Sequence, residues 1–219
     1  MRMTRIGLSV ALLLCCFDTN AEAATENGVE LLVSSSSGRV ERFDALDGQK
    51  RGVLGDPIFT PSLDNDFFPD YADPRGIGVD RFGRVYVAYR CQVLSCASAT
   101  SAVFRFSPAA GGGLLDSIDT PFVSAPGVDE GFEGLAVSSD GFDLFASQRD
   151  FGLVRHYDGR TGANIQDLAA NGSPLGLAVD GAETLYALSR APASAVENGQ
   201  ISRLIRFDSA LRAAVGRGD

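Results

Sequence analysis

Histidine and cysteine are scarce in this sequence. Among 219 residues there are one histidine and four cysteines, and Cys15 and Cys16 lie in an N-terminal apolar stretch. A structural zinc site needs four nitrogen or sulfur ligands, and only His156 could join Cys91 and Cys96 in such a site. The scarcity of these ligands therefore disfavours a zinc site.

The sequence is also poor in basic charge and in long apolar runs. The formal net charge is -9, whereas nucleic acids and anionic membranes attract basic patches. Both kinds of partner are therefore disfavoured, while cations, neutral ligands and basic protein surfaces are compatible with the charge. No run approaches the roughly 20 apolar residues of a membrane span, so we expect none. The catalytic motifs G-x-S-x-G, P-loop and H-E-x-x-H are absent.

The N-terminus has the pattern of a secretory signal peptide. Two arginines in the first five residues are followed by an apolar stretch and by a small-x-small site that ends at Ala23. We therefore predict a signal peptide over residues 1–23, cleaved near Ala23, and a secreted or periplasmic domain over residues 24–219. Close cysteines pair in an oxidising compartment, so Cys91 and Cys96 are predicted to form a disulfide.

A β-hairpin pattern recurs three times along the chain. The stretch PRGIGVDRFGRVYVA, residues 74–88, contains two apolar runs around a D-x-x-G turn, and similar stretches begin at Phe132 and Pro174. Each hairpin is followed by a strand that ends in a basic, an aromatic and a small polar residue, as in Arg105-Phe106-Ser107. A related triplet, Arg42-Phe43-Asp44, stands upstream. Glycine and aspartate suit tight turns, so the pattern predicts antiparallel connections.

Each repeat is expected to form four short strands. A last apolar segment closes the unit near Val53, Leu115 and Ile165, and the mature chain shows no sustained helical period. The fold class is therefore expected to be all-β. Four-stranded units repeated every forty to sixty residues or so predict a β-propeller, in which each unit is a blade. The first of the four visible blades lacks its inner strand; the blades span about residues 29–56, 74–119, 132–169 and 174–215.

The hairpin and the strand after it resemble a known repeat. The pattern P-x-G-(I/L)-x-V-D-x-x-G-x-(V/L)-Y-(V/A), followed by V-x-R-F-D, is similar to the NHL repeat of six-bladed propellers. Gluconolactonase-like and virginiamycin-B-lyase-like propellers share this outline. Since four blades are fewer than the resemblance implies, we expect either a tight four-bladed propeller or a truncated or open array with exposed strand edges. The incomplete array is the favoured alternative.

The long connections all fall on one face of the expected propeller. Each joins the second strand of a blade to the third, or the last strand to the next blade; they span about residues 55–73, 89–100, 119–131 and 189–200. Long loops commonly carry function. This long-loop face is therefore the expected surface for a protein, glycan or small-molecule ligand, unless the loops only cover the mouth of the channel.

Three equivalent positions differ in chemistry at the expected channel mouth. The residue before the glycine of the inner strand is Arg75, Glu133 or Leu175. Converging carboxylates at such a place can hold Ca²⁺ or act as an acid–base pair. The predicted ligand-binding residues are Arg75, Glu133, Asp129 and Glu130. The alternative is that the carboxylates form an exposed acidic loop.

A second acidic cluster lies in the first long connection. Asp64 and Asp66, with Asn65 between them, present the alternating oxygen side chains that calcium binds. The run lacks the central glycine and the closing glutamate of an EF-hand loop, so a solvated acidic loop is the alternative. The cofactor is left open, with calcium as the candidate ion and Glu133, Asp64 and Asp66 as its predicted ligands.

Two functions from different classes fit these observations. The first is an exported, non-enzymatic binding or scaffold module that uses the long-loop face. The second, implied by the resemblance, is a metal-dependent hydrolase or lyase with Glu133 as a ligand. Gluconolactonase-like enzymes carry motifs like P-N-G-L and P-D-G-L where this chain has Pro74-Arg75-Gly76-Ile77 and Pro174-Leu175-Gly176-Leu177. A cation and an apolar side chain replace ligands there, which disfavours the enzyme. A truncated product without independent function is the third alternative.

Overall fold

The protein is described from a computed structural model. The structure describes residues 30–34, 39–54, 73–90, 101–107, 112–116, 120–125, 131–170, 172–190 and 203–207. The predicted signal peptide, the predicted Cys91–Cys96 disulfide, and the predicted site residues Asp64, Asp66, Asp129 and Glu130 lie outside these residues. Among the residues described, no helix has the length and apolar character needed to cross a membrane.

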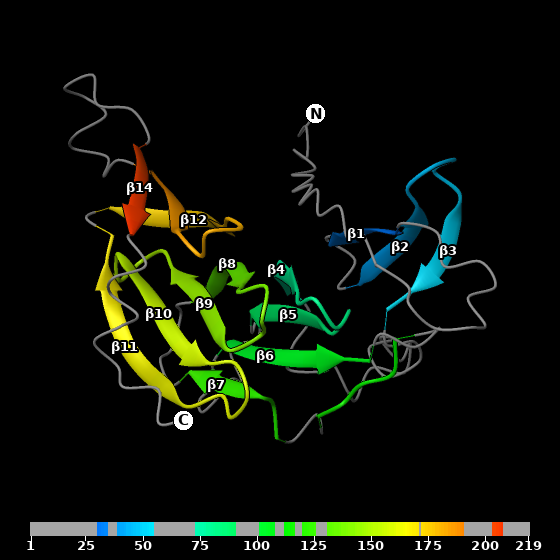
Figure 1. Ribbon diagram of the computed structural model, residues 1–219, viewed down its shortest axis with the longest axis horizontal. Helices are drawn as coiled ribbons and strands as arrows, with labels where there is room; N and C mark the ends of the chain where they lie inside the picture. The colour runs from blue at the N-terminus through cyan, green and yellow to red at the C-terminus, as the bar shows by residue number, and fades with distance from the viewer. Residues whose placement is uncertain are drawn as a thin grey trace, which may run out of the picture.

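The described chain folds into four antiparallel β-sheets (Figure 1). The first contains β1 (Glu30–Ser34), β2 (Val40–Asp44) and β3 (Lys50–Val53). The second contains β4 (Asp73–Val79), β5 (Val85–Arg90), β6 (Ser101–Phe106) and β7 (Val123–Ala125). The third contains β8 (Phe132–Val137), β9 (Asp143–Gln148), β10 (Leu153–Asp158) and β11 (Asn164–Ala169), and the fourth β12 (Ser173–Val179), β13 (Leu185–Arg190) and β14 (Arg203–Phe207). The all-β prediction is confirmed, and the sheets form an open or incomplete propeller.

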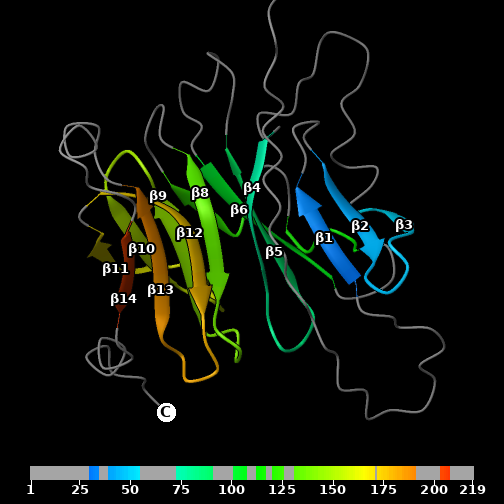
Figure 2. The ribbon, with the colours of Figure 1, turned by 90° about the horizontal axis from the view of Figure 1, so that it is seen from above.

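The sheets stand face to face in chain order, with β1–β3 and β12–β14 at the two ends of the array (Figure 2). Apolar clusters fill the space between consecutive sheets: the first joins sheets one and two, the second sheets two and three, and the third sheets three and four. Side chains of neighbouring strand residues point to opposite faces. The second sheet is covered on both faces, so every residue from Val85 to Tyr89 is buried.

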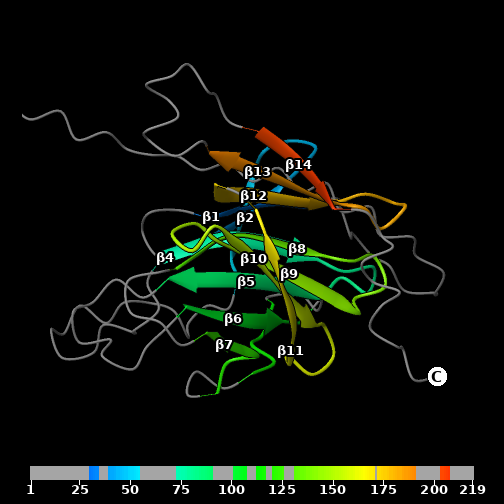
Figure 3. The ribbon, with the colours of Figure 1, turned by 90° about the vertical axis from the view of Figure 1, so that its left-hand side faces the viewer.

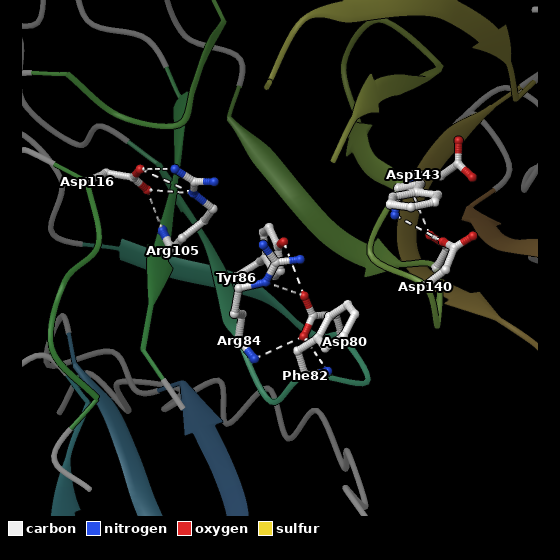
Figure 4. A network of polar contacts seen from close by, with 10 residues as sticks. Asp80, Phe82, Arg84, Tyr86, Arg105, Asp116, Asp140 and Asp143 are labelled. Atoms are coloured by element: carbon white, nitrogen blue, oxygen red, sulfur yellow. Dashed lines mark hydrogen bonds and ion pairs between the residues drawn. The ribbon is translucent and has the colours of Figure 1, made fainter. Parts of the chain in front are cut away.

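Asp80 organises the turn between β4 and β5 (Figure 4). Its Oδ1 accepts hydrogen bonds from the backbone N–H groups of Phe82 (2.9 Å) and Arg84 (3.0 Å). Its Oδ2 accepts from Arg84 Nε (2.6 Å) and from the Tyr86 hydroxyl (3.4 Å), while Gly83 has a φ of 76°. The D-x-x-G pattern thus recurs because the carboxylate pairs turn N–H groups and glycine accepts the left-handed backbone.

The turn between β12 and β13 repeats this arrangement around Asp180. The carboxylate accepts hydrogen bonds from the N–H groups of Ala182 (2.9 Å) and Thr184 (2.8 Å) and from the Tyr186 hydroxyl (3.1 Å). The hydrogen bond from Thr184 has the largest share in lowering the pKa of Asp180 below its usual value. Glu183, with a φ of 67°, occupies the place of the turn glycine.

The closing strand of the second sheet differs from the sequence-based prediction. The sequence predicts it near Leu115, but the fourth strand is β7 (Val123–Ala125), and Leu114 forms an isolated bridge with Phe106. The carboxylate of Asp116 accepts the backbone N–H of Arg105 (2.8 Å) and binds its guanidinium (2.7 Å). The Asp116 side chain thus replaces a backbone partner at Arg105, near the end of β6. The first half of β6, from Ser101 to Val103, pairs with β7.

Candidate functional site

The inner strands β4, β8 and β12 share a β-bulge at the same repeat position. In each strand the pairing register shifts around one residue: Arg75 in β4, Glu133 in β8 and Leu175 in β12. A bulge takes one residue out of the ladder and re-aims its side chain. The three positions that the sequence assigns to the channel mouth are therefore distinguished by their backbone geometry.

The third and fourth sheets approach each other closely beside Glu133. The hydroxyl of Ser147 accepts a hydrogen bond from the N–H of Gly134 (2.8 Å) and donates one to the carbonyl of Leu175 (3.0 Å). A Cβ on Gly134 would lie 2.1 Å from that carbonyl oxygen. Glycine is thus required here because the backbone of the next sheet occupies the space of a side chain.

Glu133 lies between two arginines. Its carboxylate is 3.8 Å from the guanidinium of Arg75 and 3.4 Å from that of Arg149. A hydrogen bond to Asp150 (2.8 Å), together with the negative charges of Asp150 and Glu133, raises the pKa of Arg149. The Glu133 side chain is 12% exposed, against 33% for Arg75 and 38% for Arg149. The carboxylate is therefore the most buried charge of the three.

A cavity of about 550 Å³ runs along the three inner strands. Its lining includes the bulge residues Arg75, Glu133 and Leu175, and it reaches Ser139 and Asp180 at the hairpin turns. Glycine, alanine and branched apolar residues of β4, β8 and β12 make up most of the remainder. Sites for small molecules commonly have volumes of roughly 300–1,000 Å³. The cavity is therefore large enough for such a ligand, with the charged group at its bulge end.

The bulge residues do not fit the metal site that the resemblance implies. Calcium takes six to eight oxygen ligands, and a guanidinium has no acceptor to offer. The three equivalent positions supply one carboxylate, Glu133, beside the cation of Arg75 and the apolar side chain of Leu175. Arg75 and Arg149 would also repel a further cation at this distance. Among the described residues, the predicted calcium role of Glu133 is therefore unsupported by its surroundings.

The structure brings together two of the predicted ligand-binding residues, Arg75 and Glu133. Asp129 and Glu130 lie outside the described residues, as do the two aspartates predicted to bind calcium. The ligand-binding and metal-binding roles assigned to all of these residues stay predictions.

Arg149 is a member of the site that the sequence reasoning missed. The signal lies in the pairing register: Gln148 pairs with Phe132 across β8 and β9. Glu133 is the bulged residue next to this pair, and Arg149 leaves β9 directly after Gln148, at the same end of the hairpin. Reading the register of the hairpin, in addition to its turn, would have placed Arg149 at the end of the hairpin that carries Glu133.

A second group of carboxylates lies at the hairpin turns of the third and fourth sheets. Carboxylate oxygens of Asp140, Asp143 and Glu183 lie within 4.8 Å of one another. Serine hydroxyls donate hydrogen bonds of 2.6 Å to Asp140 and to Glu183. His156 Nε2 lies 2.7 Å from Asp143 Oδ1. This group does not include Glu133, and its members take part in the hydrogen bonding of the turns.

His156 belongs to the packed interior of the third sheet. Its side chain is 2% exposed, and its ring stacks on Phe145 with 4.6 Å between the centroids. The hydrogen bond to Asp143 ties β10 to the start of β9. These contacts give the single histidine a structural role.

No protein-family model matches the chain, and no curated protein matches it. Among solved structures the chain is similar to regucalcin, a calcium-binding protein from Agrobacterium tumefaciens, with a TM-score of 0.51 and 13% identity over 82% of this chain and 56% of that one. A gluconolactonase from Xanthomonas campestris gives a TM-score of 0.53 and 20% identity over 82% and 55% of the two chains. U3-55K gives a TM-score of 0.51 and 10% identity over 81% and 48%.

These similarities concern the fold. The chain has the outline of a β-propeller built from antiparallel sheets, the fold that it shares with these structures. It spans about half the length of the structures that it matches.

Proposed function

We propose that the chain is an exported propeller-like binding module that takes up a small hydroxyl-rich ligand, such as a sugar, at its inner strands. The observation that supports this most is that Glu133 and Arg75 line the cavity together, with Arg149 in contact with Glu133 from outside the lining. A carboxylate accepts hydrogen bonds from hydroxyl groups, and guanidinium groups donate to hydroxyl oxygens. The three side chains thus supply both kinds of partner that a hydroxyl needs.

The charges of the site favour a neutral ligand over an ion. Arg75 and Arg149 are balanced by Glu133 and Asp150, which lie in contact with them. An anion would meet the two carboxylates and the net charge of -9, and a cation would meet the two guanidinium groups. Apolar side chains of the lining, Leu175 among them, can pack against the carbon face of a sugar ring.

The location of the bulge supports access from the long-loop face. Arg75, Glu133 and Leu175 all lie near the start of an inner strand. The connections that lead into these strands belong to the face on which the sequence places its longest segments. A ligand held at the bulge would therefore be reached from the long-loop face.

A metal-dependent hydrolase or lyase is the second candidate function. Its support is the fold similarity to a gluconolactonase and to a calcium-binding regucalcin, with Glu133 as the metal ligand. Arg75, Arg149 and Leu175 around that carboxylate count against it, because none of them can coordinate a metal. Binding and hydrolysis are separate readouts, so the two candidates can be distinguished.

Saturation-transfer NMR tests the binding proposal with D-glucose, D-galactose and N-acetyl-D-glucosamine as probes. The wild-type protein is expected to transfer saturation to at least one of these sugars. Glu133→Gln and Arg149→Gln should weaken binding about tenfold, since each removes hydrogen bonds to a charged group. Glu30→Gln and Arg160→Gln are the matched controls, because they alter ion pairs outside the cavity lining. Circular dichroism verifies that every variant is folded.

Two results would decide against a sugar-binding module. The proposal fails if the wild type transfers saturation to none of the sugars, or transfers it equally in Glu133→Gln. Calcium-dependent hydrolysis of D-glucono-1,5-lactone that is lost in Glu133→Gln would establish the enzyme instead. Export is tested by the intact mass of the protein recovered from the producing cells, where an N-terminus near Ala24 is expected and retention of Met1 would contradict it.

A further inference from the structure

The fourth sheet presents a face that has the make-up of an interior face but is open to solvent. We call it the outer face; Figure 3 turns this end of the array toward the viewer. It is formed by Gly176 and Ala178 of β12, Tyr186 and Leu188 of β13, and Leu204 and Arg206 of β14. Leu188 is 48% exposed and Leu204 is 70% exposed. Along β13 buried and less buried residues alternate, which marks a sheet covered on one side.

The equivalent face of the third sheet is completely covered. The pairing registers place Gly134, Ala136, Phe145, Ser147, Val154 and His156 at the same positions, and all six are buried. Val154 is 0% exposed where Leu204 is 70% exposed. The second sheet behaves like the third, because Tyr86, Ala88 and Val103 are 0% exposed. At both places the cover is the next sheet along the chain.

The glycines of the inner strands also differ between the covered sheets and the uncovered fourth sheet. A Cβ on Gly76 would lie 2.5 Å from the backbone nitrogen of Leu135, and a Cβ on Gly134 would lie 2.1 Å from the oxygen of Leu175. The corresponding Gly176 has only the Cβ of Leu188 within reach, at 4.0 Å. The fourth sheet therefore retains the small residue that lets a neighbouring sheet approach, although no described sheet lies there.

The first sheet presents the matching kind of surface at the other end of the array. Leu31 and Val33 of β1 and Glu41 and Phe43 of β2 share its back face, the side away from the second sheet. All four residues are partly exposed. At the corresponding positions of the third sheet, Leu144, Ala146 and Tyr157 are buried against the second sheet. The back face of the first sheet thus has apolar positions that a preceding sheet would cover.

We propose that the outer face of the fourth sheet docks on the back face of the first sheet in a second copy of this chain. Each seam inside the chain joins an outer face to a back face, and the same joint would continue between copies. Charge favours this pairing over a symmetric one. Glu41, which is paired with Lys50 of its own sheet (2.9 Å), can also receive Arg206 of a second copy, whereas two outer faces would place Arg206 against its own counterpart. Leu188 and Leu204 would then lose their exposed apolar surface, which favours association.

A head-to-tail joint of this kind can close into a ring or extend into a filament, depending on the angle between copies. Gly176 and Ala178 of the outer face also line the cavity, whereas Leu188, Leu204 and Arg206 do not. The joint is tested at these last residues, and it does not depend on sugar binding. Its failure would leave the proposed function untouched.

Sedimentation equilibrium of the full mature chain tests the joint. The wild type is expected to associate as its concentration rises. Leu204→Asp should weaken association more than about tenfold, and Leu46→Asp is the matched control, because Leu46 is 85% exposed in a turn of the first sheet. Arg206→Glu and Glu41→Lys should each weaken association, whereas the double variant, in which the charges are exchanged, should restore it.

Three outcomes would overturn the proposal. The first is a wild-type chain that stays monomeric at every concentration. The second is a charge-exchanged double variant that associates no better than either single variant. The third is a Leu204→Asp variant that associates as well as the wild type. A monomer whose melting temperature drops in Leu204→Asp would indicate instead that the two faces close on each other within one chain.

Discussion

Gly134→Ala probes the seam between the third and fourth sheets, beside Glu133. The added Cβ would lie 2.1 Å from the carbonyl oxygen of Leu175, an atom of the β12 backbone. A strand held in its ladder cannot yield as a side chain can, so the two sheets would have to move apart. Two hydrogen bonds would lengthen as they do: Gly134 N–H to Ser147 Oγ (2.8 Å), and Ser147 Oγ to the Leu175 carbonyl (3.0 Å).

The expected cost follows from these two effects. Overpacking costs about 1–3 kcal/mol, and each weakened hydrogen bond costs about 0.5–1.5 kcal/mol, so we expect the free energy of unfolding to fall by about 4 kcal/mol. For a chain of this length, a change of 1 kcal/mol corresponds to about 2–4 °C in melting temperature. The melting temperature measured by circular dichroism should therefore fall by about 8–16 °C, with a matching shift in urea unfolding.

Gly176→Ala is the control for this prediction, because Gly176 holds the same position in the fourth sheet. Its nearest neighbour would be the Leu188 Cβ at 4.0 Å, and neither glycine is among the residues with positive φ. We expect a change within about 1 kcal/mol, with alanine restricting the unfolded chain. Equal costs at the two positions, or no cost at Gly134, would refute the close approach of β8 and β12. An effect of Gly176→Ala on association alone would support the proposed joint.

Two further predictions concern buried polar groups. Burial raises the pKa of Tyr86 and Tyr157 to about 12, above the value of about 10 in an unfolded chain. Their contribution to stability is thus complete below pH ~10 and is lost as the pH rises from about 10 to 12, because the unfolded chain releases these protons first. Urea unfolding at several alkaline pH values should show this fall, with a shallower slope in Tyr157→Phe; equal slopes would contradict it. Asp80→Ala removes the acceptor of several turn hydrogen bonds and should cost about 3 kcal/mol, whereas Asp47→Ala, at an exposed turn position, should cost less than about 0.5 kcal/mol. Equal costs of the two substitutions would show that the Asp80 carboxylate does not hold its turn.

The hairpins could be predicted from sequence because their determinants are local. Asp80 and Gly83 lie within one turn, and their chemistry specifies the connection of the two flanking strands. The sequence shows that Arg75 and Glu133 hold the same position in their repeats. It does not predict the ion pair between them, because that contact depends on how consecutive sheets pack. The sequence predicts the closing strand of the second sheet near Leu115. There the Asp116 side chain accepts the backbone N–H of Arg105 in place of a strand partner, and strand propensity cannot predict such a contact.

The carboxylate group of Asp140, Asp143 and Glu183 was missed for a related reason. Glu183 belongs to a different repeat from the two aspartates, and no spacing within a repeat indicates that the three side chains meet. Their proximity is created by the packing of the third sheet on the fourth. Local repeats therefore predict the blade, whereas side-chain groups that cross a seam require the packing to be known.

The sugar site and the proposed joint between copies meet at β12, and this makes their coupling measurable. Leu175 lines the cavity, and the next residue, Gly176, both lines the cavity and belongs to the outer face. Glu133→Gln changes the cavity without touching the outer face, and Leu204→Asp changes the outer face without touching the lining. If Glu133→Gln lost only sugar binding and Leu204→Asp lost only association, the sugar site and the joint between copies would be independent. Loss of sugar binding in Leu204→Asp would mean that docking of a second copy sets the position of Leu175, and sugar should then strengthen association by the same factor.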